Sequence, residues 1–340
     1  MKKERKKYAI HIVLAGLCAV MAIVGIGWRG YIKSVEKKEW GELLSAKQYS
    51  RHYVMIPEDA SSLMWQDIYE SAKQEAADSD AYVELLADWS TGEYTAADYI
   101  DIAIAARVDG IIVKPDGSAR VREAIDAAGK ADIPVVTVLD DDMASSRKSF
   151  VGINSYQMGT TYGHQILSCI DEDTRRITVL LGDSDTGKDI IFKELKSTVQ
   201  AGLTKKQREQ IKISPVTIRS GSTFEAEEAI RDLFNTQEPP DILVCMNETD
   251  SVSAYHAMVD YNLVGDIDVI GFYQSETMLD AVKKGTVPMV ITLDTQQAGR
   301  SSIEALEEYH SMGYVSNFFS VDLETITRSN CSQFMQKEEE

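Results

Sequence analysis

The stretch from Arg107 to Asp142 constrains the fold more than any other part of this 340-residue chain. Ile111–Val113 is short and consists of apolar, mostly β-branched residues, which is typical of a buried strand, and a Pro-Asp-Gly turn follows it. Ser118 stands where it would cap a helix that ends at Gly129. The apolar run 133–139 predicts a second strand, followed by three aspartates. Strand, helix and strand in about thirty residues predict a βαβ unit.

The same alternation extends along most of the chain. Runs with strand and helix patterns follow one another from Tyr49 to Val321, which predicts an α/β fold with two doubly wound parallel-sheet lobes. In such sheets, ligands bind outside the carboxyl ends of the strands. We therefore expect residues 114–117 and 140–142 to face a cleft.

Three segments carry a resemblance to a known family. They are VDGIIVKP at 108–115, DIPVVTVLDDD at 132–142 and FVGINSYQMG at 150–159. In this order and spacing they resemble the type I periplasmic binding proteins, the ribose-binding and LacI-like group. The resemblance implies that the chain passes between the lobes three times, near Asn154, Leu293 and Val321. These passages would form a hinge, with a ligand held between the lobes.

The resemblance and the strand pattern together predict the domain boundaries. The expected parts are a basic tip and transmembrane anchor at 1–28, a stalk at 29–48, lobe 1 at 49–153 and 294–320, lobe 2 at 154–293 and 321–330, and a disordered tail at 331–340.

The amino terminus has the features of a membrane anchor. Five Lys or Arg residues precede a run from Tyr8 to Trp28 that contains no Asp, Glu, Lys or Arg. About 20 apolar residues can cross a bilayer, and the basic cluster predicts a cytoplasmic amino terminus with the rest of the chain outside the cell. A cleaved secretory signal and a lipoprotein signal at Cys18 are the alternatives, although the run ends without an obvious A-x-A site and Leu17 precedes the cysteine.

Charge is divided unevenly along the chain. Residues 1–40 hold nine Lys or Arg and three acidic residues, a net charge of +6. The remaining 300 residues therefore carry −25, which gives the total of −19. A body this acidic repels phosphate backbones, and nucleic-acid binding is therefore not expected.

Six residues are candidate ligand contacts, and most have a second interpretation. Asp140 follows the second strand of the βαβ unit, where the resemblance implies an aspartate that accepts hydrogen bonds from sugar hydroxyls. Trp65 could stack on an apolar sugar face or belong to the core. Asn247 could contact the ligand or cap a helix, and Asn154 could belong to the hinge. The candidate ligand contacts are Trp65, Asp140, Asn154, Asn247, Tyr273 and Asp294.

The sequence also departs from the pattern of the resembled family. Phe192 stands where relatives carry an arginine, Tyr273 where they carry an aspartate, and Leu293 where they carry a glutamine. Relatives also carry an arginine directly after the position of Asp140, where this chain has Asp141. These changes predict a cleft that is more acidic and more apolar than usual, and they leave the sugar contacts open.

The patterns that would indicate an enzyme, a cofactor or a metal are weak. GDSDTGKD at 182–189 resembles a phosphate-binding loop, but Asp189 replaces the hydroxyl residue that would meet Mg²⁺. Adjacent residues of a strand point to opposite sides, so at most two of Asp140, Asp141 and Asp142 could converge on a metal. The five histidines are scattered, and none lies in a nucleophile elbow. We expect no catalytic residue, no cofactor and no metal.

The expected function is that of an extracellular, membrane-tethered solute-binding protein. It would clasp a small molecule, most plausibly a sugar or polyol, and deliver it to an ABC permease. The alternative is a ligand-sensing co-receptor for a membrane sensor histidine kinase. A LacI-like repressor would need a basic DNA-binding segment before the first strand, where the apolar run stands instead.

Overall fold

In the computed structural model, strands and helices alternate along the chain as the sequence pattern predicts. The structure describes residues 49–86, 94–183, 187–218 and 223–335. Ser50–Glu340 forms one compact unit. The expected transmembrane anchor and stalk lie outside the described residues. Among the helices that are described, none is long and apolar enough to span a bilayer.

Lobe 1 is built on a parallel sheet with the strand order β11-β5-β4-β3-β1-β2. Its strands are β1 (Arg51–Ile56), β2 (Ala81–Leu85), β3 (Gly110–Val113), β4 (Val135–Val138), β5 (Ser149–Gly152) and β11 (Phe318–Ser320). Its helices are α2 (Leu63–Asp78), α3 (Ala96–Ala106), α4 (Ala119–Lys130) and α11 (Thr295–Met312). The predicted βαβ unit is β3, α4 and β4, and the Ser118 hydroxyl accepts the Val121 N–H at the start of α4, as a capping residue should.

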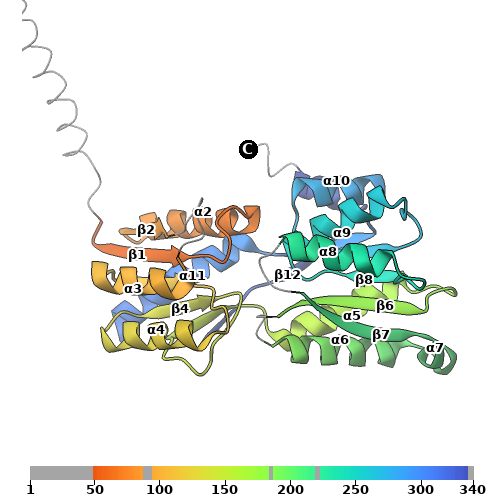
Figure 1. The fold of residues 1–340 in the computed structure, drawn as a ribbon. Helices are drawn as coiled ribbons and strands as arrows, with labels where there is room; N and C mark the ends of the chain where they lie inside the picture. The colour runs from red at the N-terminus through yellow and green to blue at the C-terminus, as the bar shows by residue number, and fades with distance from the viewer. Residues whose placement is uncertain (1–48, 87–93, 184–186, 219–222, 336–340) are drawn as a thin grey trace, which may run out of the picture. The chain divides into compact units, whose positions relative to one another are not determined.

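Lobe 2 repeats this architecture with the strand order β12-β10-β9-β8-β6-β7. Its strands are β6 (Arg176–Gly182), β7 (Lys212–Ile218), β8 (Ile242–Val244), β9 (Asp268–Phe272), β10 (Met289–Leu293) and β12 (Leu323–Thr327). Its helices are α5 (Ser155–Cys169), α6 (Lys188–Gly202), α7 (Lys205–Gln210), α8 (Thr223–Phe234), α9 (Glu248–Asp260), α10 (Glu276–Lys284) and α12 (Cys331–Met335). Figure 1 shows both lobes with their helices along the sheets.

The sheet of lobe 2 is not wholly parallel, because β12 runs antiparallel to β10. The sequence pattern did not predict β12. Only Val321 and Asp322 separate it from β11 in the other lobe. A strand parallel to β10 would need a long crossover connection before it could pair. The chain instead returns directly from lobe 1, so β12 pairs with β10 in the antiparallel direction.

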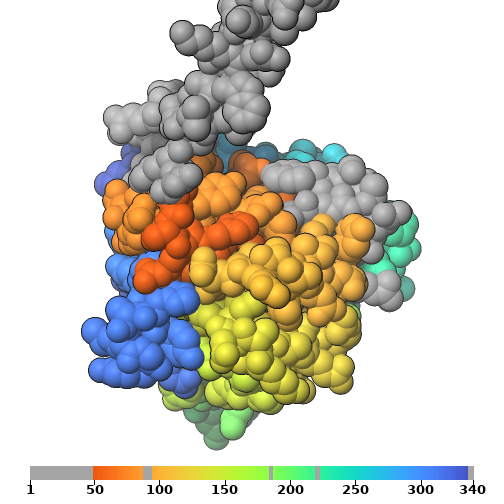
Figure 2. Space-filling model, turned by 90° about the vertical axis from the view of Figure 1, so that its left-hand side faces the viewer, coloured from red at the N-terminus to blue at the C-terminus, as the bar shows by residue number. Residues whose placement is uncertain are grey.

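Each sheet is covered by helices on both faces, because consecutive side chains of a buried strand point to opposite sides. In β1, Tyr53 and Met55 pack in the cluster that contains residues of α2 and α11, whereas Val54 and Ile56 pack in the cluster that contains residues of α3 and α4. Figure 2 looks onto lobe 1, where α3 and α4 (orange to yellow) form part of one outer face.

Three segments join the lobes, and they hydrogen-bond to one another. The chain leaves lobe 1 after β5, returns after β10 and crosses again between β11 and β12. The Gly152 carbonyl accepts the Val321 N–H at 2.8 Å, and the Asp322 carbonyl accepts the Asp294 N–H at 3.0 Å. The three crossing segments therefore lie side by side.

The carboxyl-terminal tail expected to be disordered begins instead with a helix. Residues 331–335 form α12, in which the side chains of Cys331 and Phe334 are buried in the cluster that contains α10. Two apolar residues three positions apart lie on one face of a helix, and burying that face orders the tail. Residues 336–340 lie outside the described residues.

The packing of α12 can be tested by comparing two phenylalanines. We expect Phe334→Ala to lower the free energy of unfolding of residues 50–340 by about 3 kcal/mol, because it removes a ring that is only 8% exposed. Phe224→Ala removes a ring that is 71% exposed and should cost less than ~0.5 kcal/mol. Urea denaturation measures both values. Equal, small effects would mean that the tail does not pack.

Candidate functional site

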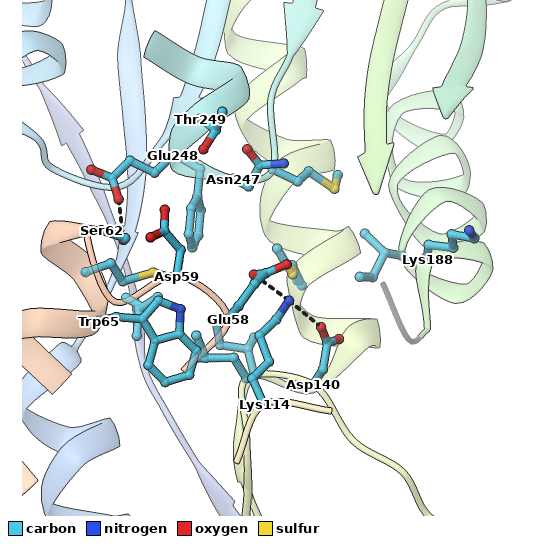
Figure 3. Close-up of a pocket in the computed structure, with 18 of the residues that line it drawn as sticks. Glu58, Asp59, Ser62, Trp65, Lys114, Asp140, Lys188, Asn247, Glu248 and Thr249 are labelled. Atoms are coloured by element: carbon cyan, nitrogen blue, oxygen red, sulfur yellow. Dashed lines mark hydrogen bonds and ion pairs between the residues drawn. The ribbon is translucent and has the colours of Figure 1, made fainter. Parts of the chain in front are cut away.

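A cavity of about 160 Å³ lies where the carboxyl ends of the lobe 1 strands meet residues of lobe 2. That volume is well above the ~15 Å³ that a single water molecule needs and is on the scale of a cavity that holds one small molecule. Residues of both lobes line it, among them Lys114 after β3 and Asp140 after β4 (Figure 3). The two residues lie where the rule for parallel sheets predicts a cleft.

Lys114 is held between two carboxylates at the floor of the cavity. Its Nζ lies 2.6 Å from a carboxylate oxygen of Glu58 and 3.2 Å from one of Asp140. The side chains of Lys114 and Asp140 are only 11% and 12% exposed. Ions this poorly hydrated depend on each other for stability, so the three groups form a fixed charged wall.

The three consecutive aspartates do not converge on one point. Asp140 pairs with Lys114, the guanidinium of Arg147 pairs with Asp141, and the Arg122 Nε lies 2.9 Å from an oxygen of Asp142. Within the described ranges, no group of three Asp, Glu, His or Cys side chains is arranged to hold a metal ion.

The start of α9 meets the start of α2 across the cavity. The Asn247 carboxamide oxygen caps α9 by accepting the Asp250 N–H at 2.8 Å, and its Nδ2 donates to the Asp250 carboxylate at 2.8 Å. The next residue, Glu248, accepts a hydrogen bond of 2.6 Å from the hydroxyl of Ser62, the N-cap of α2. A lobe 2 carboxylate therefore sits at the start of a lobe 1 helix, where the helix dipole favours negative charge.

The carboxyl of Glu248 has a raised pKa, mainly because burial disfavours its charged form. Hydrogen bonds from Ser62 and from the Met64 N–H oppose the rise, whereas the charges of Asp59 and Asp67 add to it. Glu248 is thus a half-buried acid with other carboxylates nearby.

Three of the six candidate contacts line this cavity: Trp65, Asp140 and Asn247. Trp65 belongs to the core as well as to the cavity wall, because only 2% of its surface is exposed. The interpretation of Trp65 as a core residue is confirmed, and its stacking on a sugar stays a prediction.

The other three candidates are not among the residues that line the cavity. Asn154 caps α5, where its side chain accepts the Tyr156 N–H at 2.8 Å, and Asp294 caps α11. Both stand in the segments that join the lobes. Tyr273 has a left-handed backbone with φ of 69°, and its hydroxyl donates to the Asp67 carboxylate of α2. It lies in a separate hollow together with Asp294.

The departures from the family pattern have different structural consequences. Leu293 lines the cavity, so an apolar side chain faces the cavity at a position where relatives carry a glutamine. Phe192 packs against the core instead, and its neighbour Ile191 lines the cavity. The apolar side chains Met64, Leu139, Ile153, Met158, Leu181, Met246 and Phe272 complete an apolar wall.

The loop that resembles a phosphate-binding motif is a strand-to-helix turn. Gly187 has φ of 76°, and a β-carbon there would come within 2.3 Å of the Ser155 hydroxyl oxygen. The Lys188 Nζ donates to the backbone carbonyls of Gly182 and Asp183. The lysine thus binds its own loop, as expected of a turn whose last motif residue is Asp189. Residues 184–186 lie outside the described ranges.

Sequence reasoning did not assign Glu58, Ser62, Lys114 or Glu248 as individual site residues. The rule that placed Asp140 also placed Lys114 at the cleft, without giving it a role, and Glu58 could have been found from the same rule, since it follows the carboxyl end of β1. The pairing of Ser62 with Glu248 joins residues 186 positions apart and had no sequence signal.

The chain is similar in sequence to one family model. The model of the periplasmic binding protein domain matches residues 53–311. No curated protein sequence matches the chain significantly.

Solved structures share the fold at low sequence identity. GanP, a glucose-galactose binding protein from Geobacillus stearothermophilus, is 18% identical with a TM-score of 0.74 over 82% of this chain and 98% of that chain. XylFII is 21% identical with a TM-score of 0.70 over 82% and 98%, and a chain of the XylFII–LytSN complex matches with the same identity and a TM-score of 0.71. An ABC transporter solute-binding protein from Agrobacterium vitis, bound with α-D-tagatopyranose, is 15% identical with a TM-score of 0.73 over 83% and 96%. The matched family, GanP and the Agrobacterium vitis protein are binding proteins rather than enzymes.

The charged wall leads to a test of stability. Lys114→Met leaves Glu58 and Asp140 without the ammonium between them, so we expect the free energy of unfolding to fall by ~3 kcal/mol. Lys73→Met removes the same charge from an exposed pair with Glu70 and should cost less than ~0.5 kcal/mol. Denaturant titrations of both variants measure the difference. A Lys114 variant as stable as the Lys73 variant would contradict the description of the wall.

Proposed function

Because this chain belongs to the periplasmic binding protein family, we propose that it binds one small polyhydroxylated molecule, a sugar or polyol, in the cavity between its lobes. The protein acts outside the cell, tethered to the membrane by residues 8–28, and hands its ligand to an ABC permease. Trp65, Asp140 and Asn247 are the proposed ligand contacts among the candidates from the sequence.

The composition of the cavity carries this proposal. Its lining combines apolar and aromatic groups, among them Trp65 and Phe272, with carboxylates, two ammonium groups and a carboxamide. A sugar needs both kinds of group, since its C–H face packs on aromatic rings while its hydroxyls exchange hydrogen bonds with polar side chains. The residues come from both lobes, so a bound ligand would draw the lobes together.

Hydrogen bonds between the lobes support closure around a ligand. The Ser62 hydroxyl and the Tyr273 hydroxyl each connect α2 of lobe 1 with lobe 2 through a carboxylate, Glu248 in one case and Asp67 in the other. Both bonds would break if α2 moved away from lobe 2. The closed form thus has contacts of its own, and a ligand adds to them.

A role in sensing is the second candidate function. It is favoured by the long uncharged run 8–28, which would keep the protein at the membrane, and by the likeness to XylFII, which was solved in a complex with LytSN. In this role the closed lobes would be recognised by a membrane sensor kinase instead of a permease.

Binding is tested by calorimetric titration of residues 50–340 with hexoses, pentoses and polyols, and by an asparagine pair. Asn247 and Asn154 both cap helices, so replacement of either by Ala should lower stability by ~1 kcal/mol. Only Asn247 lines the cavity. We therefore expect Asn247→Ala to weaken binding by about 10–100-fold, and Asn154→Ala to leave affinity within about threefold.

Two outcomes would contradict the binding proposal. One is a folded protein that binds none of these compounds. The other is an affinity that falls equally in both asparagine variants, because the loss would then follow the helix caps and not the cavity.

Deletion of the gene separates uptake from sensing. If the protein serves a permease, the deletion strain should lose uptake of the labelled ligand while induction of genes by that ligand persists once the ligand is inside. If it serves a sensor, uptake through an independently expressed permease should continue while induction is lost. Normal uptake in the deletion strain would overturn the transport role.

A further inference from the structure

The charges around the cavity are not balanced. The charged residues that line it are Glu58, Asp59, Lys114, Asp140, Lys188 and Glu248. Four carboxylates thus face two ammonium groups. The partners of these two ammonium groups determine which charges remain available to a ligand.

Both lysines are already engaged away from Asp59 and Glu248. Lys114 lies within 3.2 Å of two carboxylates, so its single charge is shared between Glu58 and Asp140. The Lys188 Nζ donates to two backbone carbonyls, one of them that of Gly182 at 3.2 Å. Figure 3 shows the Lys188 side chain directed away from the other labelled residues. Both ammonium groups thus have partners other than Asp59 and Glu248.

Asp59 and Glu248 form that opposite end. The Asp59 carboxylate accepts hydrogen bonds from the N–H of Ser61 at 2.9 Å and from its hydroxyl at 2.6 Å, while Glu248 accepts the hydroxyl of Ser62. Consecutive serines thus bring the two acids to the same turn, and Figure 3 shows both beside Ser62. These hydrogen-bond donors are hydroxyl and N–H groups. Because they are neutral, they do not cancel the negative charges of the two carboxylates.

Holding a half-buried carboxylate next to a second one costs free energy. Glu248 shows this cost as a raised pKa, because burial and, to a smaller extent, the charge of Asp59 disfavour its ionised form. A neutral ligand would leave the repulsion in place. A ligand with an ammonium group would remove it and would gain charge-assisted hydrogen bonds.

Building on the proposed function, we propose that the ligand carries a protonated amine besides its hydroxyl groups, and that the amine binds between Asp59 and Glu248. The hydroxyls of the same ligand would meet Asn247 and the wall of Glu58, Lys114 and Asp140. The ligand class is therefore that of amino sugars and amino polyols, and Asp59 and Glu248 are its specificity-determining residues.

Matched pairs of compounds test the amine. The pairs are D-glucosamine against D-glucose, D-galactosamine against D-galactose, and 1-amino-1-deoxysorbitol against sorbitol, titrated into residues 50–340 at a pH where the amines are protonated. The N-acetylated amino sugars serve as uncharged analogues. We expect at least one amine to bind at least about tenfold more tightly than its hydroxyl partner and its N-acetyl form.

Variants assign the preference to the two acids. Glu248→Gln and Asp59→Asn keep the shape of each side chain. Each should reduce the preference for the amine, taken as the ratio of its affinity to that of its hydroxyl partner in the same variant, to about threefold or less. Glu209→Gln removes one negative charge from an exposed position on α7 and should leave the preference unchanged. An equal loss in all three variants would point to net charge and would contradict the proposal.

The outcomes distinguish this inference from the proposed function. If neutral sugars or polyols bind as tightly as their amine partners, the inference fails and the solute-binding function stands. If a folded protein binds neither the neutral compounds nor the amines, the proposed function fails as well. A higher affinity for the amines that persists in Glu248→Gln and Asp59→Asn would overturn the assignment to these residues.

Discussion

The site depends on the backbone hydrogen bonds between the three segments that join the lobes. Gly152 with Val321, and Asp294 with Asp322, tie segments that come from distant parts of the chain into one narrow strip. Side chains at this strip are occupied in capping helices: Asn154 begins α5 and Asp294 begins α11. Because α5 and α11 start at this strip, the strip sets their orientation relative to the two sheets. The cavity lies between elements that the strip positions.

Helix starts and strand ends then determine the chemistry of the cavity. Parallel strands place Glu58, Lys114 and Asp140 at one edge of the lobe 1 sheet, and the first turn of α9 brings Asn247 and Glu248 opposite them. The start of α2 accepts Glu248 from the other lobe. Contacts between the lobes and groups that face the cavity therefore share residues. Under the proposed function, lobe closure and ligand binding would be energetically linked.

The fold could be predicted from the sequence because its signals are local. The βαβ unit, the Ser118 cap and the alternation of elements need only neighbouring residues. The strand β12 and the helix α12 were missed because each is short and is ordered by partners elsewhere in lobe 2. Membership of the periplasmic binding protein family agrees with the three segments that carried the resemblance.

The site was less predictable than the fold, because side-chain directions and contacts between the lobes are not encoded in local sequence. Sequence places a residue at the end of a strand, but the backbone decides where its side chain points. Tyr273 follows β9 as a ligand contact would, yet its left-handed φ of 69° accompanies a side chain that binds Asp67 instead of lining the cavity. Glu248 and Ser62 are brought together only by the meeting of two lobes, which no local pattern encodes.

Hydrogen exchange, measured on residues 50–340 with and without the most tightly bound compound, tests the central claim most directly. The account predicts slower exchange at the start of α2 and at the start of α9 together, because the ligand joins segments of both lobes. Protection confined to one lobe, or found on an outer helix face away from Trp65 and Asn247, would contradict a site between the lobes.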